Sequence, residues 1–137
     1  VTRRTSYTSI SISDLEGGIK CHTLMSSTIA NGANSDDQSY LFGKIKEYKR
    51  GEIISPLIRL TADKKILQQE YRADSIKEFD VFKQNDYSVH AVFEGGGNPY
   101  SEYLVLDLDI GEFRQTRIDF YEGGRLSITR GTCYKNE

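Results

Sequence analysis

The last third of the chain alternates apolar and polar residues in four stretches, which are separated by glycine-containing breaks. The stretches are residues 87–93, 103–109, 116–120 and 126–129, and the breaks are residues 94–99, 110–111 and 122–124. Alternation with a period of two is the pattern of half-buried β-strands, and short breaks with glycine are typical of hairpin turns. This region therefore predicts an antiparallel meander and places the chain in the all-β class.

The first third shows the same alternation. Residues 6–13 and 19–25 each alternate around the turn at residues 14–18, which predicts a first hairpin. Residues 26–39 have no periodicity and many turn-forming residues, so we expect them to form the longest loop.

The middle of the chain is less regular. Residues 40–48 and 53–60 are interpreted as strands, the second with Pro56 at an edge or a bulge. Residues 61–73 fit either a helix capped by Thr61 or a hairpin with its tip at residues 63–65, and the hairpin is favoured because its flanks resemble strands. Residues 76–94 predict one more hairpin.

Together these segments predict one domain over residues 1–137, with residues 1–5 as a loose tail. A meander of about eight to ten strands protects its edges by closing into a β-barrel or by folding into a β-sandwich. We expect one of these two architectures, with at most one short helix.

The chain has two cysteines, Cys21 and Cys133, near its opposite ends. A disulfide between them is favoured over two buried thiols and would close a loop of about 113 residues. Disulfides persist in oxidising compartments, and the sequence begins at Val1 as a processed protein would. Both observations predict a secreted or periplasmic protein.

No catalytic or metal-binding motif stands out. His22 and His90 lie alone in predicted strands, and neither cysteine has metal-site spacing, so we expect no metal and no cofactor. Asp107 and Asp109 could form a hydrolytic pair, although alternating aspartates are more typical of the solvated face of a sheet. The protein is therefore expected to bind a partner rather than to catalyse a reaction, and a carboxylate hydrolase is kept as an alternative.

Charge and composition narrow the class of partner. The net charge is −2 at pH 7, which argues against a nucleic-acid-binding surface, and no apolar run approaches the length of a membrane span. Tyrosine and arginine side chains often anchor protein interfaces, so a protein partner is expected. The candidate binding residues are Tyr100, Tyr103, Arg114, Arg117, Tyr121, Tyr40 and Lys46.

Three segments resemble small secreted bacterial β-domains such as the periplasmic lysozyme inhibitors. Residues 60–66 are similar to a turn that leads into a strand in that family, residues 106–113 to its Leu-Asp-x-x-x-Gly turn, and residues 131–135 to its terminal Gly-x-Cys sequence. The resemblance implies a compact barrel, a stabilising disulfide and a partner protein rather than a substrate.

Three functions remain open at this level. The leading hypothesis is a secreted or periplasmic protein that inhibits or neutralises a partner protein, as an enzyme inhibitor or an immunity protein does. The first alternative is a calycin-like carrier of a small apolar ligand. The second is a hydrolase that uses carboxylates such as Asp107, Asp109 or Glu102.

Overall fold

The computed structural model describes residues 9–30, 45–47, 56–72, 75–94, 100–119 and 125–135. Within these ranges the chain forms one short helix, α1 (Ile12–Gly17), and one antiparallel sheet of nine strands. The strands are β1 (Ile19–Ala30), β2 (Ile45–Glu47), β3 (Leu57–Leu60), β4 (Ile66–Arg72), β5 (Ser75–Gln84), β6 (Ser88–Glu94), β7 (Tyr100–Asp107), β8 (Glu112–Asp119) and β9 (Arg125–Lys135).

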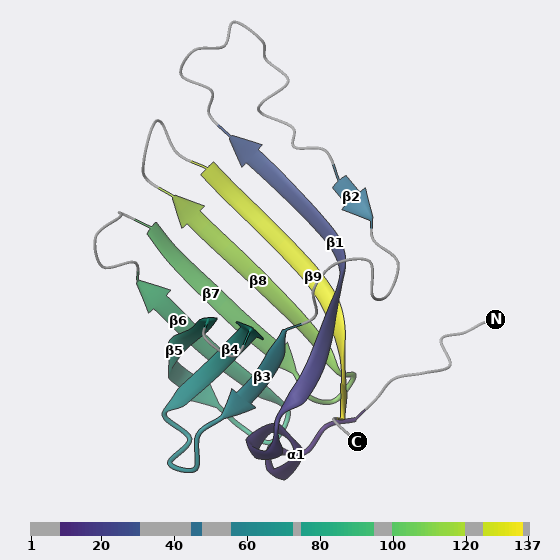
Figure 1. The fold of residues 1–137 in the computed structure, drawn as a ribbon, viewed down its shortest axis with the longest axis vertical. Coiled ribbons are helices and arrows are strands. Elements are labelled where there is room, and N and C mark those ends of the chain that lie inside the picture. Colours follow the sequence, from purple (N-terminus) through teal and green to yellow (C-terminus); the bar gives the residue numbers. More distant parts are fainter. Residues whose placement is uncertain are drawn as a thin grey trace, which may run out of the picture.

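The sheet closes into a β-barrel, which decides between the two predicted architectures. Neighbouring strands from β3 to β9 pair in chain order, and β1 pairs with both β3 and β9 (Figure 1). Eight strands of the described ranges therefore complete the barrel, and β2 extends the sheet from the edge of β1 at Met25–Ser27. None of the helical structure in the described ranges has the length and hydropathy that a membrane span requires.

The predicted first hairpin is wrong, because residues 12–17 are helical. The Ser11 side chain accepts a hydrogen bond from the backbone N–H of Asp14, and the Asp14 carboxylate accepts one from the N–H of Ser11. This reciprocal cap satisfies N–H groups at the helix start, and the same two bonds lower the pKa of Asp14. Leu15 adds a fully buried side chain, so capping and burial outweigh the strand-like alternation of Ile10 and Ile12. Residues 6–8 lie outside the described ranges.

The predicted hairpin over residues 61–73 is confirmed. Thr61 Oγ1 donates to Asp63 Oδ1 at 2.7 Å and accepts from the N–H of Ile66, and these bonds hold the turn between β3 and β4. Lys64 takes the left-handed conformation that a tight turn needs at this point. The predicted loop at residues 26–39 begins later than expected, because β1 continues to Ala30, and residues 31–39 lie outside the described ranges.

The predicted disulfide is confirmed as well. Cys21 of β1 and Cys133 of β9 are direct partners in the register and are bonded to each other. The bridge therefore links the first and the last strand of the barrel, where the sheet closes on itself.

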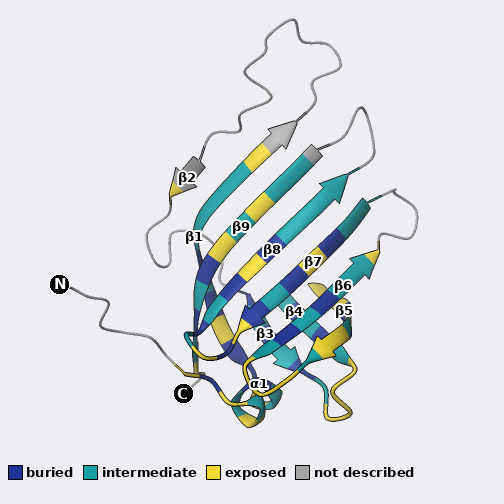
Figure 2. Cartoon of the chain, turned by 180° about the vertical axis from the view of Figure 1, so that it is seen from behind, coloured by how far each residue is buried: buried dark blue, intermediate teal, exposed yellow. Residues whose placement is uncertain are grey.

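The core fills the end of the barrel that α1 covers. It contains inward-facing side chains from α1 and from every barrel strand. The core residues are between 0% and 3% exposed. Figure 2 shows these buried positions as dark blue bands across the strands. The core residues are Ile10, Leu15, Ile19, Cys21, Ile58, Leu60, Leu67, Phe79, Val89, Ala91, Leu104, Leu106, Leu108, Phe113 and Cys133.

Candidate functional site

The inner face of the barrel changes from apolar to polar along its length. Every second residue of β8 points inward, and this series runs from Phe113 through Gln115 and Arg117 to Asp119. The paired series on β7 runs from Leu106 and Leu104 to Glu102 and Tyr100. The end of the barrel away from α1 is therefore lined by groups that recognise ligands through hydrogen bonds and charge.

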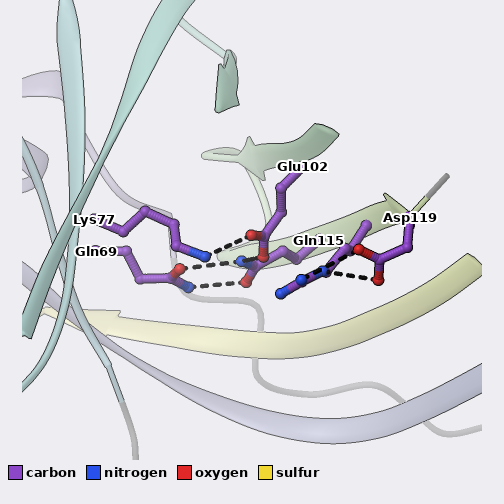
Figure 3. Close-up of polar contacts among 6 residues, drawn as sticks. Gln69, Lys77, Glu102, Gln115 and Asp119 are labelled. Atoms are coloured by element: carbon purple, nitrogen blue, oxygen red, sulfur yellow. Dashed lines mark hydrogen bonds and ion pairs between the residues drawn. The ribbon is translucent and has the colours of Figure 1, made fainter. Parts of the chain in front are cut away.

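A buried polar network spans the barrel where the apolar core ends (Figure 3). Gln69 of β4 and Gln115 of β8 exchange two amide hydrogen bonds of 2.8 and 3.0 Å. Gln115 also donates to one Glu102 oxygen, while the Lys77 ammonium group donates to the other at 2.7 Å. Gln69 is 0% exposed, Glu102 7% and Gln115 8%, so these polar groups are desolvated and depend on one another.

A second ion pair lies next to this network. The Arg117 guanidinium donates to both oxygens of Asp119 at 3.1 and 3.2 Å, and it stacks 3.9 Å from the centre of the Tyr100 ring. Burial lowers the pKa of Arg117, but the hydrogen bond and the charge of Asp119, together with smaller electrostatic contributions from Glu102 and Tyr100, outweigh burial and raise this pKa above its ordinary value. Arg117 is therefore a permanently charged group whose charge Asp119 balances.

The pairing of β5 changes beside the network. The register between β5 and β6 covers only Asp80–Gln84 of β5, so in the described ranges residues 75–79 pair with β4 alone. A hollow of about 830 Å³ lies at this seam. We call it the seam hollow; its lining residues are Ile66, Tyr71, Ser75, Ile76, Lys77, Glu78, Asp80 and Phe93.

Lys77 joins the seam hollow to the buried network. Its side chain is 28% exposed, and its ammonium lies 5.0 Å from the centre of the Phe93 ring and 5.7 Å from that of Tyr100. Burial, and to a lesser degree the negative charge of Glu102, raises the pKa of Tyr71. The Tyr71 hydroxyl is therefore neutral at physiological pH and can donate a hydrogen bond to a ligand.

The structure separates the binding residues that the sequence predicted. Tyr100 and Arg117 lie together on the inner face, while Tyr103 and Arg114 lie on the outer face of β7 and β8. Arg114 lines a second, outer hollow of about 380 Å³ with Tyr87 and His90. Lys46 is in β2, and Tyr40 and Tyr121 lie outside the described ranges.

The three carboxylates named for a hydrolase do not all lie at one site: Asp107 and Asp109 both line the outer hollow, whereas Glu102 lies inside the barrel. Glu102 is buried inside the barrel, whereas Asp107 is exposed at the end of β7, on the opposite face. The expectation that Asp109 belongs to the same strand is wrong, because β7 ends at Asp107. Asp107 instead accepts the backbone N–H of Asp109 at 3.1 Å and stabilises the turn to β8. No group of His, Cys, Asp or Glu in the described ranges is arranged to hold a metal ion.

Sequence analysis missed Lys77, Gln69 and Gln115. Each is a polar residue at a position that strand alternation assigns to the inner face, two residues from a core residue such as Leu67, Phe79 or Phe113. Where the inward-facing residues along a strand change from apolar to polar, the apolar core of a barrel ends. That signal was present in the sequence and could have identified the site.

Comparison with protein families, with characterised proteins and with solved structures finds no match to this chain.

Proposed function

We propose that this protein is a calycin-like binding protein that carries a small ligand with an apolar body in the seam hollow. The observation that carries the proposal is a hollow of about 830 Å³ that reaches a buried, hydrogen-bonded polar network. Pockets for small molecules commonly have about 300–1,000 Å³ of space, apolar and aromatic walls and a few fixed polar groups. Phe93, Tyr71 and Ile76 supply the walls here, and Lys77 supplies a fixed polar group.

Fluorescence titration with N-phenyl-1-naphthylamine, an uncharged apolar probe, tests this function. We expect saturable binding at one site and about five- to tenfold weaker binding after Ile76→Ser, because the ligand would lose contact with a side chain that it buries. Ile76 is 49% exposed without a ligand, so the substitution leaves folding intact.

Ile128→Ser is the matched control. Ile128 is 44% exposed on β9 and does not line the seam hollow. Equal loss of probe binding in both variants, or binding that does not saturate, would rule out the seam hollow as the ligand site.

A second candidate function, inhibition of a partner protein, is favoured by the outer face of β7, β8 and β9, which Figure 2 presents to the viewer. Tyr103 is 39% exposed and Ile128 44%, and Thr116 is the register partner of both, so the two side chains lie in one row across the sheet. Exposed aromatic and aliphatic side chains in one row form the kind of surface that protein interfaces bury.

Lysozymes are the partners to test first, because the sequence resembles lysozyme inhibitors. If this function holds, the protein slows the lysis of a bacterial cell-wall suspension, and Tyr103→Ala weakens inhibition about tenfold by removing an interface anchor. Tyr87→Ala is the control, since Tyr87 is 66% exposed and lies outside that row. Full inhibition by the Tyr103 variant, or no inhibition of any lysozyme tested, would contradict this function.

The disulfide supports a location in an oxidising compartment for either function, since such bonds are rare where thiols are kept reduced. We propose the secreted or periplasmic space as that compartment.

A further inference from the structure

The Lys77 ammonium group occupies a site with the features of an organic-cation site. The buried Glu102 carboxylate contacts it at 2.7 Å, and the Phe93 and Tyr100 rings lie 5.0 and 5.7 Å away from it. A desolvated carboxylate and aromatic faces within about 6 Å are the groups that attract ammonium ions in protein sites.

This ammonium group is not locked into the core. The Lys77 side chain is 28% exposed, and it belongs to the part of β5 that pairs with β4 alone in the described ranges. Lysine has a flexible stem of four methylene groups, so its head group can leave Glu102 and enter solvent through the seam hollow. The Glu102 carboxylate would remain in place, held by Gln115.

The charges around the hollow favour a cation as the group that replaces the Lys77 ammonium beside Glu102. Among the lining residues, Glu78 and Asp80 are acidic and Lys77 is basic. With Lys77 withdrawn, Glu78, Asp80 and Glu102 leave three carboxylates around the hollow. The nearby Arg117 interacts with Glu102 as well, but its charge is paired with that of Asp119. An anion would meet like charges there, whereas a cation would restore the ion pair that Glu102 loses.

We propose that the Lys77 ammonium group fills a cation site when no ligand is bound, and that the natural ligand is an organic ammonium compound. Its ammonium group takes the place of the Lys77 head group between Glu102, Phe93 and Tyr100, and its apolar body lies in the seam hollow. The inference rests on the proposed carrier function and names the chemical class of the ligand.

Three probes with one common body test this assignment: 4-phenylbutylamine, 4-phenylbutanol and 4-phenylbutyrate, compared by calorimetry at pH 7 and constant ionic strength. We expect wild-type protein to bind the amine most tightly and the carboxylate most weakly. Lys77→Gln removes the competing ammonium group and keeps a hydrogen-bond donor, so binding of the amine should become about tenfold tighter while binding of the alcohol stays unchanged.

Two further variants make the test specific. Lys83→Gln, on the same strand but outside the seam hollow, removes the same charge and should change none of the three affinities. Glu102→Gln should abolish the preference for the amine. The order of the three probes on wild-type protein decides the question even if a variant in the network fails to fold.

Other results of these titrations would refute either the cation site or the carrier function. Preference for the carboxylate, with weaker binding after Lys77→Gln, would make Lys77 an anchor for anions, and equal binding of all three probes would show no charge selection. In both cases the cation site is refuted and the carrier function stands. If none of these probes and no N-phenyl-1-naphthylamine binds, the carrier function itself is refuted.

Discussion

Replacing Gly131 with alanine is expected to lower the free energy of unfolding by about 3 kcal/mol or to prevent folding. A Cβ atom at this position would overlap the carbonyl oxygen of His22 on the neighbouring strand and the ring of Phe113 in the core. The His22 carbonyl belongs to the backbone of β1 and Phe113 is 1% exposed, so neither group can move aside without disturbing the barrel. Urea unfolding followed by circular dichroism measures the change.

Gly17→Ala provides the matched control. Gly17 ends α1, and no atom outside its immediate neighbours lies within 4 Å of an added Cβ. Alanine there should be neutral or slightly stabilising, because it restricts the unfolded chain and favours the helix. Equal stability of the two variants would contradict the close approach of β9 to β1 and Phe113.

Loss of the Cys21–Cys133 disulfide is expected to have the largest effect on stability. The bridge joins residues 112 positions apart, and cross-links that close loops of this length stabilise a fold by about 4–5 kcal/mol in the chain-entropy model. The double variant Cys21→Ala, Cys133→Ala keeps both core positions apolar and removes only the cross-link and two sulfur atoms. Its melting temperature should fall by about 10 °C or more.

Reduction of the wild-type protein separates the cross-link from the packing of the sulfur atoms. Dithiothreitol should lower the melting temperature of wild-type protein toward that of the double variant and leave the double variant unchanged. The prediction fails if thiol titration shows complete reduction of the wild-type protein while its melting temperature stays the same.

Much of the secondary structure was predictable because strands and turns depend on neighbours close in the chain. Residues 87–93 and the hairpin at Thr61 show this, since alternation and turn-forming side chains act within a few residues. The helix at residues 12–17 was missed because Ile10 and Ile12 alternate as in a strand, although Ile12 is the first residue of the helix. The reciprocal cap between Ser11 and Asp14 was visible in the sequence and would have corrected the prediction.

The candidate site was predictable only in part. Tyr100 and Arg117 were named from their chemistry, but so were Tyr103 and Arg114, which lie on the other face of the sheet. Residue type alone does not determine which face is the inside. Lys77 and Glu102 come from strands that are distant in sequence, and their contact depends on the curvature of the closed sheet.

The amino-acid sequence by itself determined the all-β class and the hairpins at residues 61–73 and 76–94, and it favoured a disulfide between the two cysteines. Those properties follow from the two-residue period of a strand, from turn chemistry and from there being two cysteines in the chain. Only the tertiary structure decided that the sheet closes as a barrel and that Lys77 meets Glu102 beside a hollow. Closure and this contact depend on the register and twist of all the strands together, and no single segment of the chain encodes them.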